Sequence, residues 1–408
     1  KGLWQKSTST RTNMLIKNVS VLYGKDLDYI QHTNVRISDQ AFEAINVNPK
    51  PKEESYDCEG LLMVPGFINA HIHVGDSIAK DIGIDYGVDE KIHPIMGFKK
   101  KVLRNSSSSH LTSFIRSSCL SMIKKGITTF VDFREDGLNG IELLRKAVSG
   151  LPIRSIILGR TEYYQDFRSI KKNIPLPASK KDELTKLLKK CDGLGISGPN
   201  ENSDVVLKYY SNIKKIRAIH SAETIESCEI SKKITGKTET QRALLLKPHF
   251  LVHMTHASKK DLLLVAKHKT SIVVCPRANA ALAEGIPDVT LMMKTGCNIA
   301  IGTDNVMINS TDMFREMDYL WKVSMGTQKK RLSPKYILKM ATVNAANMLQ
   351  NKKIGTIQPH NFADCIFIDK HAIDLEPMHN PYASIVHRAS ENVVKAVMIG
   401  GKIVFGKI

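Results

Sequence analysis

The sequence predicts an α/β protein: a (β/α)8 TIM barrel with a small β-sandwich domain built from both chain ends. Strand-like apolar runs alternate with helical segments through the middle of the chain, and eight such runs occur. Alternation of this kind implies parallel pairing, and eight units close a barrel. The runs lie at residues 67–71, 128–133, 153–158, 194–197, 216–220, 250–253, 271–275 and 298–302.

Helix signals between these runs support the alternation. Apolar residues recur on one helical face over 111–123, after a serine-rich start. Ser333 followed by Pro334 provides an N-cap and a first-turn proline. This pair predicts one helix that runs through Met348.

The two ends of the chain predict a second, smaller unit. Short strand-like runs separated by turns lie within 14–65 and again within 353–408, and the first stretch is too small to hold a core alone. We therefore expect both ends to pair into one β-sandwich, with the barrel occupying 66–352. Residues 1–13 are polar and lack periodicity, so we expect them to form a disordered extension.

Composition bounds the class of protein. The 408 residues are 42% hydrophobic and 24% charged, which is typical of a soluble globular chain. No stretch approaches the roughly 20 apolar residues that span a bilayer, and the start is too polar for a secretory signal. The seven cysteines are scattered singly, which argues against a disulfide framework or a zinc ribbon. We expect a cytoplasmic protein without a membrane partner.

The strong positive charge raises the question of a nucleic-acid partner. Lys and Arg total 59 against 40 acidic residues, a formal charge of +19. The lysines, however, are spread in short groups such as 99–101, without interleaved aromatic residues or a continuous basic helix face. We therefore expect solvated surface lysines and no nucleic-acid partner. A positive field can still draw in an anionic small molecule.

Histidines and a carboxylate at strand ends predict a metal site. His71 and His73 are two residues apart on a strand, so both imidazoles can face one divalent ion. His220 ends the fifth predicted strand and Asp304 follows the eighth. The carboxyl ends of barrel strands meet at one mouth, where active sites lie. Three imidazoles and a carboxylate suit Zn²⁺ or Fe²⁺ and leave a position for water.

Two further residues lie at the same mouth. Glu223 lies three residues beyond His220, where a carboxyl can move a proton between water and substrate; a surface salt bridge is the competing interpretation. His253 ends the sixth predicted strand, and His256 lies three residues beyond it. A register slip of three would exchange the roles of these two histidines.

The chain resembles the amidohydrolase superfamily, and within it the cytosine deaminase and triazine hydrolase branch. The resemblance runs from about Met14 to near the C-terminus and rests on six ordered motifs, completed by a C-terminal tail of three short segments. They are Pro65-Gly66-Phe67-Ile68-Asn69-Ala70-His71-Ile72-His73, then 126–132, 220–223, 251–256, 275–279, 301–305, 341–346, 354–357 and 363–364.

The resemblance implies a role for each site residue. It implies His71, His73, His220 and Asp304 as metal ligands, Glu223 as the proton shuttle and His253 as the residue that orients the water. It also implies that Asp304 accepts a proton from the attacking water. Binuclear members carry a lysine at the end of strand four, and 193–198 has none, so one metal ion is expected. Homo-oligomers are common in the family, and the sequence leaves this open.

The implied reaction is hydrolysis at a carbon bonded to nitrogen, most simply deamination of an aminated purine, pyrimidine or nucleoside with release of ammonia. Cleavage of another amidine or of a cyclic amide is one alternative, and an inactive barrel that serves as an interaction partner is another. Polar residues near the strand ends are candidate contacts for a small-molecule substrate. They are Arg160, His256, Arg277, Asn279, Asn305 and Asn309.

Overall fold

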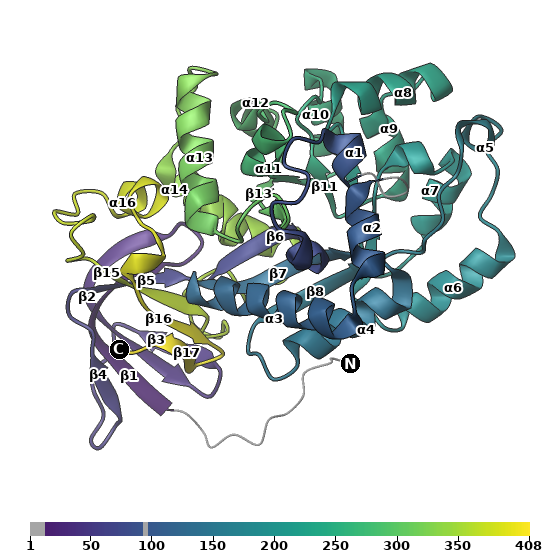
Figure 1. The fold of residues 1–408 in the computed structure, drawn as a ribbon. Helices are drawn as coiled ribbons and strands as arrows, with labels where there is room; N and C mark the ends of the chain where they lie inside the picture. Colours follow the sequence, from purple (N-terminus) through teal and green to yellow (C-terminus); the bar gives the residue numbers. More distant parts are fainter. Residues whose placement is uncertain (1–12, 93–96) are drawn as a thin grey trace.

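The computed structural model describes residues 13–92 and 97–408, apart from the side chains of Val88 and Asp89. The predicted disordered extension therefore lies outside the described residues, except for Asn13, which begins the first strand. Two sheets organise the described chain, and helices pack around the larger of them (Figure 1).

The larger sheet is the predicted barrel. Its order is β13-β12-β11-β10-β9-β8-β7-β6-β14, and every neighbouring pair is parallel. All eight predicted runs form strands of this sheet, which confirms the predicted fold class. The strands are β6 (Phe67–His73), β7 (Ile127–Arg134), β8 (Arg154–Gly159), β9 (Gly193–Ile196), β10 (Ile216–Ser221), β11 (Phe250–His253), β12 (Ser271–Val274), β13 (Ile299–Ile301) and β14 (Asp304–Asn305).

The eighth strand is split, and its second piece closes the sheet. Gly302 and Thr303 separate β13 from β14, and β14 pairs with β6, with Asp304 opposite Ile72. A Cβ on Gly302 would lie 2.7 Å from the backbone nitrogen and oxygen of His71, so only glycine fits where these strands meet. We call this junction of β6 with β13 and β14 the seam. The buried Asn69 side chain also connects its two sides, because Asn69 Oδ1 accepts from the Thr303 amide at 3.0 Å.

Helices follow most barrel strands, as βα units require. The predicted helix over 111–123 is confirmed as part of α3. The predicted single helix from Pro334 through Met348 is wrong, because it breaks at Ala341 and Thr342 into two. The main helices are α2 (Phe98–Asn105), α3 (Ser108–Lys124), α4 (Gly137–Val148), α6 (Ala178–Leu188), α7 (Asp204–Tyr210), α8 (Ile225–Thr235), α9 (Glu239–Ala243), α10 (Lys259–Lys267), α11 (Pro276–Ala281), α12 (Val289–Lys294), α13 (Met313–Gly326), α14 (Pro334–Met340), α15 (Val343–Met348) and α16 (Pro381–His387).

The smaller sheet joins both ends of the chain. Its order is β17-β16-β15-β5-β1-β2-β3, with β4 added on β1, so β15 from the C-terminal part pairs directly with β5 from the N-terminal part. One apolar core includes side chains from β1, β2, β3, β5, β15 and β16. The strands are β1 (Asn13–Tyr23), β2 (Asp28–Ser38), β3 (Ala41–Ile45), β4 (Ser55–Asp57), β5 (Leu61–Pro65), β15 (Cys365–Asp369), β16 (Val394–Ile399) and β17 (Lys402–Gly406).

A buried ion pair connects the two sheets. Arg154 at the start of β8 pairs with Asp364, which directly precedes β15. The Arg154 guanidinium also lies 4.6 Å from the ring centroid of Phe362. The second carboxylate oxygen of Asp364 accepts from the Gly400 amide at 2.7 Å. The barrel and the small sheet therefore share a charged contact in their interface.

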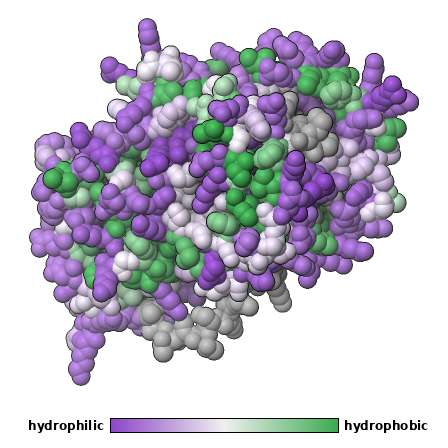
Figure 2. Space-filling view, viewed as in Figure 1, coloured by the Kyte–Doolittle hydropathy of each residue, from purple (hydrophilic) through white to green (hydrophobic). Residues whose placement is uncertain are grey.

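The surface of the molecule is mixed in hydropathy. On the face drawn in Figure 2, hydrophilic side chains predominate and apolar side chains form only limited patches between them. Among the described residues, no helix combines the length and apolar character needed to cross a membrane.

Candidate metal centre and active site

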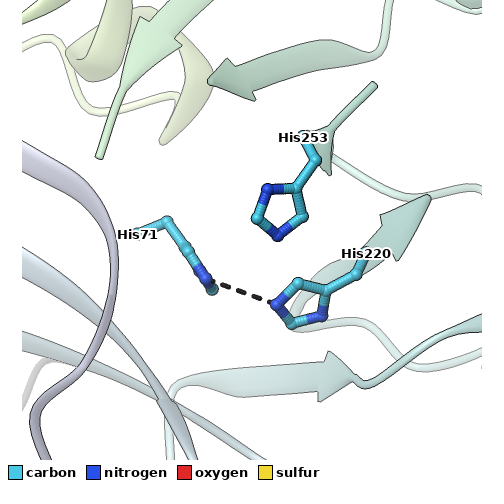
Figure 3. A group of neighbouring side chains, drawn as sticks. All are labelled: His71, His220 and His253. Atoms are coloured by element: carbon cyan, nitrogen blue, oxygen red, sulfur yellow. Dashed lines mark hydrogen bonds between the residues drawn. The ribbon is translucent and has the colours of Figure 1, made fainter. Parts of the chain in front are cut away.

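The four predicted metal ligands converge where β6 and β10 end and where β14 begins, just beyond β13. His71 Nε2 lies 3.2 Å from Asp304 Oδ1, and His73 Nε2 lies 3.6 Å from the same oxygen. His220 Nε2 lies 3.3 Å from His71 Nε2, as the dashed line in Figure 3 shows. Two overlapping groups in this cluster, His71 with His73 and Asp304 and His71 with His220 and His253, have ligand atoms within 4.8 Å of one another.

Neighbouring acceptors fix which ring nitrogen faces the cluster. His220 Nδ1 lies 3.0 Å from the Ile196 carbonyl oxygen, which can only accept, so Nδ1 carries the hydrogen. His73 Nδ1 lies 2.9 Å from Glu135 Oε1 and donates in the same way. Both rings therefore present the Nε2 lone pair to the centre, which is the arrangement that metal-binding histidines require.

The charges of the cluster suit a divalent cation. Burial lowers the pKa of His71 to about 4 and that of His220 well below its ordinary value, so both imidazoles are neutral. Burial alone would raise the pKa of Asp304, but the hydrogen bond with His71 opposes this effect and the pKa lies below its ordinary value. Asp304 Oδ2 is buried and has no hydrogen-bond partner among the described residues. Neutral imidazoles around a carboxylate with such an oxygen fit a bound divalent ion.

His253 and Glu223 complete the centre. The His253 ring stacks on His220 with centroids 5.4 Å apart and planes 26° from parallel (Figure 3). Its Nε2 lies 3.4 Å from Glu223 Oε1, and its Nδ1 lies 3.4 Å from Asn279 Oδ1. Glu223 therefore lies beside the cluster, and Asn279 contacts the other ring nitrogen of His253.

His256 lies away from the cluster. Its Nε2 lies 2.8 Å from the Glu284 carbonyl oxygen, and its side chain lines a separate cavity with Cys228 and Glu239. The structure thus places His253, and not His256, at the metal centre.

A polar cavity of about 160 Å³ opens onto the centre. His73, His220 and Glu223 contribute to its wall, as do two of the predicted substrate contacts, Arg160 and Asn305. Asn305 also donates to Asp76 at 2.7 Å. Arg160 also lines an adjoining cavity of about 140 Å³. The wall of that cavity includes apolar side chains from α2, α3 and α4.

The other two predicted contacts lie elsewhere. The Arg277 guanidinium pairs with Glu316 on α13 at 3.3 Å and contacts Asn309 Oδ1 at the same distance. Neither Arg277 nor Asn309 lines the cavity at the metal centre. Their side chains instead join the loop after β14 to α11 and α13.

Sequence reasoning missed a buried charged network behind His73. Glu135, one residue beyond β7, contacts Lys99 at 2.6 Å and Arg134 at 2.7 Å in addition to His73. Lys99 also lies 3.3 Å from Asp76. Burial alone would raise the pKa of Glu135, but Lys99 and His73 hold it well below the ordinary value. The position of Glu135 directly after a strand was the signal that could have revealed it.

Cys275 and Glu239 were also missed. Cys275, directly after β12, has its Sγ within 4.8 Å of ligand atoms of His253 and Asp304. Burial raises the pKa of this thiol well above its ordinary value, so it is neutral. Glu239, on α9, lines the cavity at the metal centre although no strand ends near it in sequence.

Comparison with known proteins agrees with this architecture. The model of the amidohydrolase family matches residues 62–404. A putative aminohydrolase of Methanothermobacter thermautotrophicus is 36% identical over 397 residues, which cover 96% of this chain and 99% of that protein. A 5-methylthioadenosine/S-adenosylhomocysteine deaminase of Thermoanaerobacter pseudethanolicus is 28% identical and covers 96% of this chain and 93% of its own length.

Solved structures share the fold. A zinc-bound adenosine deaminase from Xanthomonas campestris superposes with a TM-score of 0.84 at 18% identity, covering 97% of this chain and 93% of that one. Guanine deaminase from Escherichia coli gives a TM-score of 0.77 at 16% identity, covering 97% and 100%. Because the family model spans most of the sequence and the 36% identical relative aligns along nearly all of it, the chain belongs to the amidohydrolase family.

Proposed function

We propose that this protein is a zinc-dependent aminohydrolase that removes an amino group from a heterocycle of the purine, pyrimidine or nucleoside class. The observation that carries the proposal is the position of Glu223, beside His253 and on the wall of the same cavity as His73 and His220. A bound divalent ion would supply Lewis acidity, which makes water a competent nucleophile near neutral pH.

The residues divide the remaining work. We assign Glu223 to move the proton from the attacking water to the nitrogen that leaves, so that a carbon–oxygen bond forms, the carbon–nitrogen bond breaks and ammonia departs. His253 lies against Glu223 and orients the water, and Asp304 accepts a proton in addition to its ligand role. Arg160 and Asn305 line the cavity and are the residues we expect to contact the substrate.

The names of relatives support deamination and zinc. Relatives that align along nearly the whole chain are named as deaminases of adenine-containing nucleosides, and the adenosine deaminase with the same fold holds zinc. We therefore propose one zinc ion held by His71, His73, His220 and Asp304.

The test is an ammonia-release screen with zinc-loaded protein against purines, pyrimidines, their nucleosides and triazines. A positive compound is then assayed with Glu223→Gln, whose amide keeps its size but cannot shuttle a proton. We expect kcat to fall by roughly 10²- to 10⁴-fold with zinc content unchanged. Glu226→Gln, at an exposed position of α8, is the matched control and should keep the wild-type rate.

Two results would argue against the proposal. Wild-type turnover by Glu223→Gln would assign the proton transfer to another residue. Absence of ammonia release from the whole panel, together with hydrolysis of a cyclic amide, would move the protein to that alternative reaction.

A further inference from the structure

The turn that carries Glu223 has an uncommon backbone conformation. Ala222, between the end of β10 and Glu223, has a φ of 51°. Residues with a Cβ rarely adopt this left-handed conformation. Because Glu223 follows Ala222 directly, a return of Ala222 to an ordinary φ would turn the Glu223 side chain away from His253. The direction of Glu223 thus depends on whatever holds Ala222.

Two hydrogen bonds hold the Ala222 peptide groups. The Ala222 carbonyl accepts from the His256 amide at 2.9 Å. The Ala222 amide donates to Glu239 Oε2, also at 2.9 Å. Ser227 Oγ, in the first turn of α8, donates to the same oxygen at 2.7 Å. One side-chain oxygen of Glu239 therefore joins the Ala222 turn to the helix that follows it.

Glu239 is itself fixed in place. It is only 5% exposed and lies in the first turn of α9, directly after the N-cap Thr238. Thr238 Oγ1 donates to Asp261 on α10 at 2.7 Å. Further along α9, the fully buried Arg242 pairs with Asp204 on α7 at 2.9 Å. A short helix anchored to two neighbours presents the carboxyl group with little freedom.

We propose that Glu239 is a positioning residue, which accepts the Ala222 amide and so holds the left-handed turn that directs Glu223 at the metal centre. This inference rests on the proposed function, because Glu239 acts through Glu223. Burial raises the pKa of Glu239 to about 7, against the hydrogen bonds from Ser227 and Ala222. A protonated carboxyl group still has a carbonyl oxygen that can accept the hydrogen bond from the Ala222 amide. The length of the side chain is therefore what holds the turn, and its charge is not required.

Two variants of Glu239 separate the effect of side-chain length from the effect of charge. Glu239→Gln loses the charge but keeps an oxygen at the same distance along the side chain. Glu239→Asp keeps the charge but is one methylene shorter, so its carboxyl group withdraws from the Ala222 amide. Glu226→Gln and Glu226→Asp provide the same two changes at an exposed position nearby.

Two readouts are measured on the zinc-loaded proteins. The first is hydrogen exchange in peptides that cover 219–227, which reports the Ala222 amide without any substrate. The second is kcat and KM for the best compound of the ammonia screen. For Glu239→Asp we expect exchange at least about tenfold faster and kcat at least about tenfold lower, with KM and zinc content little changed. Glu239→Gln should stay within about threefold of wild type in both readouts.

The opposite pattern, an impaired Glu239→Gln and a normal Glu239→Asp, would overturn the proposal in favour of a role for the charge. Wild-type behaviour of both variants would overturn it too, since the turn would then hold without Glu239. If wild-type protein releases no ammonia from any compound, the proposed function fails, and the exchange measurement still decides whether Glu239 holds the turn.

Discussion

Individual residues of the site follow a simple positional rule. His71, His73, His220 and Asp304 all lie at or just after the carboxyl end of a parallel strand, and such ends converge on one mouth of a barrel. The rule requires no knowledge of side-chain packing, and the four residues do fall in two overlapping groups that share His71. For His253 and His256 the rule left the choice open, and it is the structure that places His253 beside Glu223 and His256 against the Glu284 carbonyl.

The rule does not predict individual contacts between side chains that come from different secondary-structure elements. Glu135 obeys it, but its importance comes from Lys99 and His73, which arrive from other elements. Glu239 does not obey it, because it comes from a helix that packs under the β10 turn. Arg277 obeys it and yet turns toward Glu316, outside the cavity wall. Which way a strand-end side chain turns depends on its tertiary neighbours.

At the residue scale, we predict that Glu135→Gln weakens metal binding. The amide can still accept from His73 Nδ1, but the charge that orients this ring and balances Lys99 is lost. Changes to groups that orient metal ligands typically cost 10- to 100-fold in affinity. Zinc competition against a chromophoric chelator measures the effect. Glu142→Gln, at an exposed position of α4, is the control, and equal affinity of the two variants would contradict the prediction.

Among the secondary-structure elements, the eight barrel strands were predictable and their interruptions were not. Apolar runs of four to eight residues mark buried strands well. The helix predicted to run from Pro334 to Met348 breaks because the Ala341 carbonyl accepts from the Ile68 amide at 2.8 Å, a contact with β6 in place of a helical one. Local sequence patterns cannot predict that a backbone carbonyl of the helix will accept a hydrogen bond from a strand far away in the sequence.

At the element scale, we predict that Gly302→Ala is destabilising. The added methyl group would lie 2.7 Å from the His71 backbone, so β13 and β6 would have to move apart. Overpacking of this kind costs about 1–3 kcal/mol of unfolding free energy, and the movement should also lower zinc occupancy, because His71 is the residue displaced. Urea unfolding and metal analysis measure both effects.

Gly326→Ala is the matched control for this change. No atom lies within 4 Å of the added Cβ at the end of α13, so we expect neutral or slightly stabilising behaviour. If Gly302→Ala unfolds at the same urea concentration as Gly326→Ala, the seam is looser than its geometry indicates.

For the whole molecule, the sequence predicted that both chain ends meet, because the N-terminal stretch is too small to hold a core alone and the C-terminal stretch has the same kind of short strand-like runs. It did not predict how the resulting sheet is attached to the barrel. Arg154 and Asp364 are 210 positions apart, and only the folded chain brings them together. Pairing over such a separation leaves no periodic signal in a single sequence.

We predict that Asp364→Ala destabilises the whole molecule. The substitution leaves the largely buried Arg154 guanidinium without its carboxylate and the Gly400 amide without its acceptor. Removal of one partner from a buried ion pair typically costs about 3–5 kcal/mol. Denaturant unfolding followed by circular dichroism measures the loss, with the exposed Asp374→Ala as the control. A midpoint shared by the two variants would show that the ion pair adds nothing to the interface.

The closing pair of strands has a thermodynamic consequence. β14 and β6 are joined over only two residue pairs, and these place Asp304 beside Ile72 and Asn305 beside His73. Three of the proposed ligands lie on the two sides of this pairing, His71 and His73 on β6 and Asp304 on β14, so a bound ion would hold the two strands together. Ligand binding and barrel closure are then linked equilibria, so unfolding free energy should rise with the logarithm of free zinc. By the same reciprocity, whatever strains the seam open would release the ion.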